Sequence, residues 1–318
     1  MRNFLILIVI VGAGAYFGSK WHLHNEVSNG MDMATILMAP YANVEYDGVA
    51  STLSGELTIE GIRVRIHGFN DTLYIERFGI DTPSFLSLLE LDDVAKRQSD
   101  DLPEYFGFLI EGMRIPANAD YYRKFYSFVL ESRGVTDADD VGVECTGKYG
   151  FSSEALAGLG YTEQVISSSI TFNNRPGSYS MDVAMSMEDM WEMAGNLTLA
   201  GDLLSEISRG TAYRPRLSSF EIEVKDRSLN ARVNEYCAKR GLSEKEILQA
   251  QLDSFKFVGT ENGIEFDEYV LDPYMEYLGG KSTLVFTARP SEPIALSQID
   301  LYKPSDVPAL LNLEAVAL

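Results

Sequence analysis

The sequence predicts an α+β protein in which an N-terminal transmembrane helix is followed by a largely antiparallel β-sheet domain with flanking helices. Three observations support this fold class. Residues 4–18 carry no charge. Many later segments alternate apolar and polar residues, as strands with one buried face do. The turns between them, such as residues 174–177, are too short for the crossover helices that parallel strands require, so the sheet is expected to be antiparallel.

Composition limits the class of protein. The chain has 318 residues, enough for one large domain or two ordinary ones. Its hydrophobic fraction of 46% and charged fraction of 23% are typical of globular proteins and exclude wholesale disorder. The formal net charge of -21 would repel phosphate backbones, so nucleic acid is not expected as a partner. An acidic surface also commonly serves solubility alone.

Residues 1–21 are predicted to form a membrane anchor. Arg2 precedes the uncharged segment, and Lys20 follows it. At about 1.5 Å per residue the segment reaches roughly 22 Å, so it spans a core of about 30 Å only if Arg2 and Lys20 extend their charged ends to the membrane surfaces. The residues assigned to the anchor are Phe4, Leu5, Ile6, Leu7, Ile8, Val9, Ile10, Val11 and Trp21.

A cleaved signal peptide is the alternative interpretation of the same residues. Ala13, Gly14 and Ala15 supply the small-x-small pattern of a cleavage site. Against cleavage, Tyr16 and Phe17 would then form an apolar new N-terminus. Both interpretations place the remainder of the chain on the non-cytoplasmic side of a membrane.

Three further segments follow the anchor. Residues 22–40 are predicted to be helical, either as a stalk or packed on the domain, and Pro40 ends this helix. A subdomain of β-hairpins and helices is expected at 41–134, and a subdomain of antiparallel strands and helices at 153–318. The polar, glycine-bearing stretch between them is interpreted as a border or a long loop.

The first subdomain opens with the clearest strand pattern in the chain. Residues 55–66 alternate on both sides of Gly61 with a slip in phase, which predicts a β-bulge at that glycine. Residues 72–80 alternate again, so the two segments are expected to pair as an antiparallel hairpin. Thr82 and Pro83 then predict the start of a helix.

A further strand and helix complete the first subdomain. The strand is expected at 106–115. The helix after it carries Tyr122, Phe125, Tyr126 and Val129 at helical spacing and is expected to end at Gly134. Such an aromatic stripe is more typical of a packed core than of a cofactor site.

The second subdomain is predicted to begin with strands, continue with two helices and end with strands. The early strands are expected at 165–172, 178–187, 197–200 and 217–224. One helix is expected at 228–240, and a capping box of Ser243 and Glu246 starts the next. The late strands are expected at 283–288, at a short segment through Leu301, at 307–311 and at 313–318, where the last closes the sheet.

Cysteine and histidine residues are few. Cys145 and Cys237 are the only cysteines. In an exported protein they permit one disulfide, and two buried free thiols fit the sequence equally well. His22 and His24 are two residues apart, which is the wrong spacing for two metal ligands on one helical face. His67 is interpreted as the end of a strand.

No motif for catalysis, cofactor binding or metal binding is found. Residues 137–142 resemble the start of a calcium loop, but Lys148 stands where such a loop needs glutamate, so a solvated acidic turn is expected. A catalytic triad would have to use His67, and no serine is indicated as its partner. A nucleophile elbow, a Walker A loop and a zinc-protease helix motif are all absent. We therefore expect no enzymatic activity and no cofactor.

Part of the pattern resembles a known class of envelope protein. The hairpin segments 55–64, 71–78 and 81–83 look like the repeating hairpins of AsmA-like and YdgA-like bacterial envelope proteins. Residues 225–229 and 241–244, each entering a helix, also resemble the YdgA-like pattern. The resemblance covers about half of the chain and implies a single-pass inner-membrane anchor, a periplasmic domain and a role in envelope maintenance with lipid handling through an apolar groove. It implies no catalytic residues.

Three functions follow from these observations. The leading one is a membrane-anchored, non-enzymatic periplasmic protein that binds a lipid or another apolar ligand, which predicts an extended sheet with an apolar concave face. The second is an interaction subunit of a secretion or envelope-assembly complex, which predicts an exposed apolar patch and a protein partner. The third is an extracytoplasmic hydrolase, which predicts titratable residues converging in one cleft. The expected partners are the bilayer, through the N-terminal helix, and an apolar ligand or envelope protein.

Overall fold

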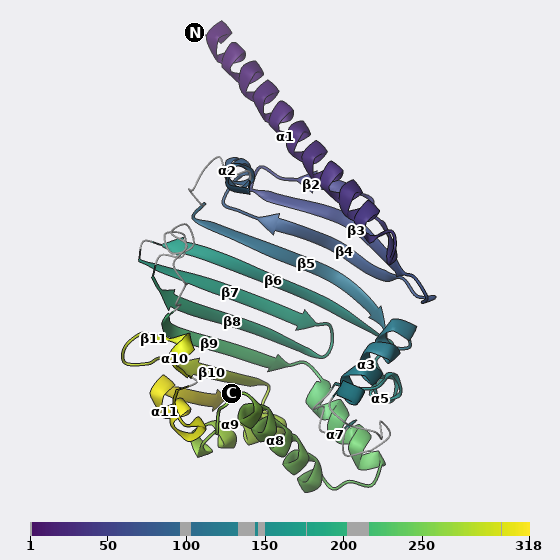
Figure 1. The fold of residues 1–318 in the computed structure, drawn as a ribbon, viewed down its shortest axis with the longest axis vertical. Coiled ribbons are helices and arrows are strands. Elements are labelled where there is room, and N and C mark those ends of the chain that lie inside the picture. The colour runs from purple at the N-terminus through teal and green to yellow at the C-terminus, as the bar shows by residue number, and fades with distance from the viewer. Residues whose placement is uncertain are drawn as a thin grey trace. The chain divides into compact units, whose positions relative to one another are not determined.

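The computed structural model describes residues 2–95, 103–132, 144–145, 150–175, 177–201, 216–299 and 301–318, and the side chains of 2–15, 92–95 and 296 lie outside the description. The chain forms two compact units, unit 1 (Met1–Gly112) and unit 2 (Met113–Leu318). The division falls inside strand β5 (Tyr105–Pro116), whereas the sequence placed it between 134 and 153. A large antiparallel sheet with flanking helices confirms the α+β class (Figure 1).

Unit 1 contains one long helix and a set of antiparallel strands. Both β1 and β2 pair with β3, and β3 pairs with β4, so the expected hairpin is confirmed. The helix expected from Pro83 begins two residues later. The elements are α1 (Arg2–Met38), β1 (Ala42–Glu45), β2 (Gly48–Ser51), β3 (Glu56–Ile66), β4 (Leu73–Asp81), α2 (Phe85–Ala95) and the first part of β5.

The expected bulge at Gly61 is wrong. Glu60 pairs with Arg77 and Ile62 pairs with Ile75, so the register is the same on both sides of the glycine and no residue is inserted. Gly61 instead adopts a φ of 62°, a left-handed conformation that favours glycine. The alternation of apolar residues changes from odd to even positions at this glycine, where the backbone has the left-handed conformation.

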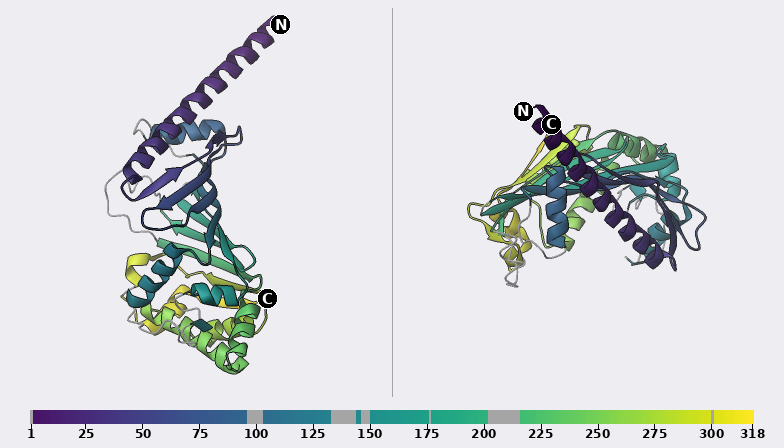
Figure 2. Two further views of the ribbon diagram at one scale, coloured as in Figure 1. Left: turned by 90° about the vertical axis from the view of Figure 1, so that its right-hand side faces the viewer. Right: turned by 90° about the horizontal axis from the view of Figure 1, so that it is seen from above.

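Helix α1 is continuous and packs on the rest of unit 1 through the middle of its length (Figures 1 and 2). Leu23 is buried against Phe85 and Leu88. Lys20 Nζ donates a hydrogen bond of 2.9 Å to the backbone carbonyl of Ser51. The helix ends at Met38, before Pro40, and it is therefore packed on the domain along residues that the sequence left open as a stalk.

The anchor residues lie at the start of α1. The helix contains all of the residues assigned to the anchor, Phe4, Leu5, Ile6, Leu7, Ile8, Val9, Ile10, Val11 and Trp21, but the side chains of the first eight fall outside the described residues. Trp21 is exposed. Within the part of the chain that the structure describes, no helix combines the length and the hydropathy needed to cross a membrane. The anchor stays a prediction.

Unit 2 is built on antiparallel strands in the order β6-β7-β8-β9-β10-β12, with β11 also paired to β9. The expected closure of the sheet by the C-terminal segment is confirmed, because β12 pairs with β10. The strands are β6 (Glu163–Arg175), β7 (Ser178–Met187), β8 (Trp191–Ala200), β9 (Arg216–Asp226), β10 (Thr283–Ala288), β11 (Ile294–Ala295) and β12 (Leu313–Ala317).

Helices pack against these strands. Two expectations for the C-terminal part are wrong: residues 307–311 form a helix, and the short strand through Leu301 is reduced to β11 before a helical turn. Helix α9 was not expected, because it contains Pro273. The helices are α3 (Asp120–Ser132), α5 (Ser153–Gly158), α7 (Leu229–Lys239), α8 (Glu244–Glu261), α9 (Glu268–Leu278), α10 (Leu296–Ile299), the 3-10 helix η1 (Pro304–Asp306) and α11 (Val307–Leu311).

Candidate functional site

One face of the unit 2 strands is mostly apolar, with Ser168, Asn174 and Asp226 as polar members. Side chains alternate between the two faces of a strand, and the cross-strand register fixes which residues of neighbouring strands share a face. Residues directly opposite one another include Ile170 with Val183, Met185 with Met193, and Gly195 with Ile222. The apolar members of this face include Ile166, Ile170, Phe172, Tyr179, Met181, Val183, Met185, Met187, Trp191, Met193, Leu197, Leu199, Leu217, Phe220, Ile222, Val224, Leu284 and Phe286.

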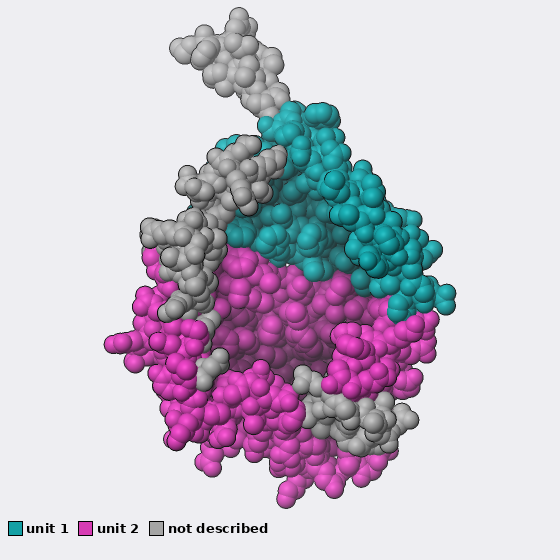
Figure 3. Space-filling model, in the orientation of Figure 1, with its two compact units in different colours: residues 1–112 teal, residues 113–318 magenta. Residues whose placement is uncertain are grey.

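The ends of the apolar face are covered and its middle is open. Leu199 and Leu217 are buried with Val307 and Leu311 in one cluster, while Trp191 packs against the cluster around α5 and α7. In the middle of the face Ile170 is 38% exposed and Met185 is 36% exposed. Figure 3 shows unit 2 hollowed over these strands. The middle of the apolar face is therefore open to water. In a fully packed core these apolar side chains would be covered.

Methionine is concentrated in the open middle of the apolar face. Met181, Met185 and Met187 alternate along β7, and Met193 lies opposite Met185 on β8. A methionine side chain is unbranched and polarisable, so it adapts its shape to whatever packs on it. Surfaces rich in methionine therefore suit apolar ligands of variable shape better than a single rigid partner.

A pocket of about 360 Å³ opens beside the methionines, at the end of the apolar face. Met193 and Val224 lie on its strand side with further residues of β8 and β10, and α7 and α9 supply the helical side. Its other lining residues are Trp191, Leu229, Asn230, Tyr274, Tyr277, Leu278, Leu284 and Phe286. No charged side chain is among them. The volume falls within the usual range for small-molecule sites, which are mostly apolar with a few polar groups.

Aromatic stacking fixes the wall of the pocket that α9 contributes. The ring of Phe255 lies between those of Phe266, at a centroid distance of 4.5 Å, and Tyr274, at 4.1 Å. Stacked rings at such distances hold one another in place. Phe255 therefore covers one face of the Tyr274 ring, which lines the pocket.

The opposite face of the same strands is polar. A second pocket of about 350 Å³ lies there, lined by residues that include Asp182, Asn196 and Glu221. The Asp182 carboxylate accepts hydrogen bonds of 2.6 Å from both Asn173 and Asn196, and Glu221 pairs with Arg289. These carboxylates already have partners. Among the described residues no group of histidine, cysteine and acidic side chains is placed to hold a metal ion.

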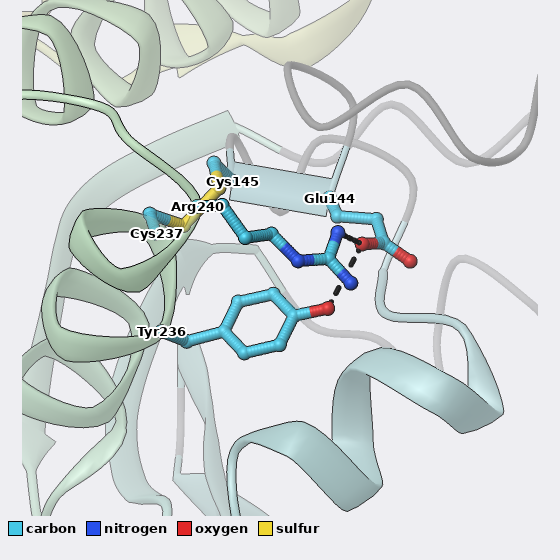
Figure 4. Close-up of a disulfide and its surroundings, with 5 residues drawn as sticks. All are labelled: Glu144, Cys145, Tyr236, Cys237 and Arg240. Atoms are coloured by element: carbon cyan, nitrogen blue, oxygen red, sulfur yellow. Dashed lines mark hydrogen bonds and ion pairs between the residues drawn. A yellow bond between two sulfur atoms is a disulfide. The ribbon is translucent and has the colours of Figure 1, made fainter.

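A disulfide and a buried carboxylate anchor α7, the helix that carries Leu229 and Asn230 to the pocket. Cys145 and Cys237 form a disulfide bond. The sequence had left a disulfide and two free thiols as equal alternatives. Glu144 beside it is only 3% exposed. Figure 4 shows Tyr236 and Arg240 directed at its carboxylate.

Three donors satisfy the Glu144 carboxylate. Ser152 Oγ donates to Oε1 at 2.7 Å. Tyr236 Oη donates to Oε2 at 3.0 Å, and Arg240 Nη1 donates to the same oxygen. The Arg240 guanidinium also lies 4.3 Å from the centre of the Tyr236 ring. A buried carboxylate is tolerated when it is paired and fully hydrogen-bonded, so this cluster is a structural support for α7.

The histidines show no catalytic arrangement. His24 Nε2 lies 2.8 Å from Ser51 Oγ, a pairing that the sequence did not indicate. Burial and, secondarily, the charge of Lys20 lower the His24 pKa, and no described acidic side chain orients its ring. His67 contacts the Pro40 carbonyl and Asn43, and no serine of the described residues is hydrogen-bonded to it. The segment 137–142 that resembles a calcium loop, and Lys148 after it, lie outside the described residues.

Four tyrosines of unit 2 should make the protein sensitive to alkali. Burial, as the first cause, raises the pKa of Tyr126, Tyr236, Tyr274 and Tyr277 from 10.0 to about 12. Between these values the unfolded chain has lost protons that the folded chain keeps, so a rise in pH favours unfolding. The contribution of these tyrosines to stability should be constant below about pH 10 and fall from there to about pH 12.

Urea unfolding at several alkaline pH values, followed together with tyrosinate absorbance, measures this dependence. The Tyr274→Phe variant is the control, because it lacks one of the titrating groups and should show a shallower loss. Tyrosines that all ionise near pH 10 with no change in stability would contradict the burial that the structure gives them.

Comparison with known proteins matches the C-terminal part of the chain to a family model. A protein-family model described as an uncharacterized protein matches residues 163–318. No curated protein and no solved structure matches the chain. The matched segment begins with β6 and contains every strand of the apolar face and all of the pocket-lining residues.

Proposed function

We propose that this chain is a non-enzymatic binding protein that holds a lipid or another apolar ligand on the apolar face of unit 2. The open, methionine-rich middle of that face is the observation that carries the proposal. An apolar face of this kind leaves Met185 and Ile170 in contact with water unless something covers it. Flanking helices, the adjacent pocket and the adaptable methionines favour a flexible apolar molecule as the ligand.

We propose further that the protein is anchored in the inner membrane by residues 1–21, with the rest of unit 1 and unit 2 in the periplasm and a role in envelope maintenance. The uncharged segment at the N-terminus supports an anchor. The disulfide supports the location, because such bonds persist in the periplasm and are rare in the cytoplasm. Membrane attachment would place the apolar face within reach of lipid.

The proposal predicts that an apolar compound co-purifies with the protein. The full chain would be extracted from native membranes in detergent, purified, and analysed by mass spectrometry for bound lipid. Because lipid can also co-purify with a membrane helix, the amount of bound lipid is compared between two variants that have the same N-terminal segment. Met185→Glu places a carboxylate on the apolar face, and Ala184→Glu places one on the opposite face of the same strand.

The Met185→Glu variant should retain about ten-fold less of the bound compound than the wild-type protein. A carboxylate held against an alkyl chain costs at least about 1.4 kcal/mol of binding free energy. The Ala184→Glu variant should retain as much as the wild-type protein. Equal retention by the two variants, or a wild-type protein without any bound apolar compound, would refute the proposal.

An interaction subunit is the second candidate, and helix α3 favours it. Phe125 is 64% exposed and Phe128 is 65% exposed, three residues apart on one helical face. Two exposed aromatic side chains at this spacing are typical of a helix that packs on another protein. In the same purification, a stoichiometric protein partner without bound lipid would favour this candidate over the first.

A further inference from the structure

The pocket at the end of the apolar face lies next to a carboxylate. Asp226 is the last residue of β9 and is directly opposite Trp191 in the register with β8. Asp226 is two positions after Val224 in the same strand, so both side chains lie on the apolar face. Opposite residues of neighbouring strands have Cβ atoms about 5 Å apart, which places the carboxylate beside the Trp191 indole.

No described cation neutralises Asp226. The Asn230 amide at the start of α7 donates a hydrogen bond of 3.0 Å to its Oδ1, and the Leu229 amide also contacts it. Among the described residues it forms no ion pair with lysine or arginine. Burial raises the pKa of the Asp226 carboxyl, and the Asp226 charge helps to raise the pKa of Tyr277, so the field of this carboxylate reaches the pocket wall. The α7 amides offset only part of the charge.

The pocket itself is aromatic. Trp191, Tyr274, Tyr277 and Phe286 line it. The faces of aromatic rings attract cations, and cages of such rings bind quaternary ammonium groups. Asp226 adds a negative charge at the same place, but its hydrogen-bonding capacity is partly used by α7. A cation that needs charge and ring faces but no hydrogen-bond acceptor suits this surrounding best.

We propose that the pocket binds the trimethylammonium head of an amphiphile whose alkyl chain lies along the methionines of the apolar face. This proposal rests on the proposed function and names the chemical class of the ligand. Met193 belongs to both the pocket and the face, and it lies opposite Met185, so head and chain would occupy one continuous surface. An anionic head would meet the only partly offset charge of Asp226 and no cation among the pocket-lining residues.

Binding of three amphiphiles with the same alkyl chain tests this assignment. The full chain would carry Trp21→Phe, an exchange of an exposed side chain that leaves Trp191 as the only tryptophan. Its emission would report titrations with decyltrimethylammonium, decyl sulfate and decyl glucoside below their micelle-forming concentrations. The ammonium compound should bind about ten-fold more tightly than the sulfate.

Two variants locate the preference. Asp226→Asn keeps a residue that can accept the α7 amides, and it should reduce the preference for ammonium to about two-fold. Asp272→Asn is the matched control, because it removes the same charge from an exposed position on α9 and should leave the preference unchanged. Tyr274→Leu should weaken binding of the ammonium compound more than that of the glucoside.

The outcomes separate the two proposals. Equal affinity for the three heads, tighter binding of the sulfate, or a preference that Asp226→Asn and Asp272→Asn reduce equally would overturn the ammonium assignment while leaving the apolar site in place. Absence of binding by all three compounds would overturn both proposals.

Discussion

Replacing Arg240 with methionine should lower the free energy of unfolding by about 3 kcal/mol. The Glu144 carboxylate is 3% exposed, and Arg240 is its only cationic partner among the described residues. Without the guanidinium a negative charge remains buried with two neutral donors, Ser152 and Tyr236. The Arg240 side chain is 35% exposed, so water can approach part of the site and the effect should lie near the lower end of that expected for a buried pair.

A double-mutant cycle separates the charge from the packing of Arg240 on Tyr236. In the Glu144→Gln background the buried group is neutral, so Arg240→Met should cost only about 1 kcal/mol. Urea unfolding of the four proteins gives the coupling energy. An equal cost in both backgrounds would show that Glu144 is not charged in the folded protein or that the pair does not form.

Loss of the disulfide should have an effect of similar size. The bond joins residues 92 positions apart in the sequence, and chain-entropy arguments assign about 4.6 kcal/mol to a loop of that length. Engineered and natural bonds commonly give less, so the Cys145→Ser, Cys237→Ser double variant should unfold with a free energy about 3 kcal/mol lower than the wild-type protein. Urea unfolding under non-reducing conditions measures the difference.

Reduction of the wild-type protein provides the matched control, because it breaks the same bond without changing the side-chain volume. It should reproduce most of the loss seen in the double variant and should have no effect on the variant itself. Equal stability of wild type and double variant without reductant would show that the thiols are not bonded.

Local sequence signals were sufficient where short-range chemistry determines an element. The capping box of Ser243 and Glu246 predicted the start of α8, and both of its hydrogen bonds form. Alternation along β7 predicted a strand with one apolar face. By contrast, Val307 to Leu311 form a short apolar run that fits a strand or a helix equally well, and its packing against Leu217 and Ala288 decides for the helix.

The site could be predicted only in part, because its members are brought together by the fold. The sequence indicated an apolar sheet face but not the pocket. Trp191 lies on β8 and Tyr274 lies on α9, a helix that the sequence did not indicate because it contains Pro273. Ala194 and Gly195 interrupt the pattern of β8, so only its last residues were expected as a strand. The pairing of Glu144 with Arg240 has no local signature at all.

The open middle of the unit 2 apolar face underlies the whole account, and cross-linking in living cells tests it most directly. Cells producing the full chain would be fed a fatty acid that carries a photoactivatable diazirine and a click handle, then illuminated, and the adducts would be mapped by mass spectrometry after denaturing purification. Adducts are expected on β7 and β8, around Met185 and Met193. The Met185→Glu substitution should remove them, and Ala184→Glu should not. Adducts confined to the N-terminal residues, with none on these strands, would contradict it.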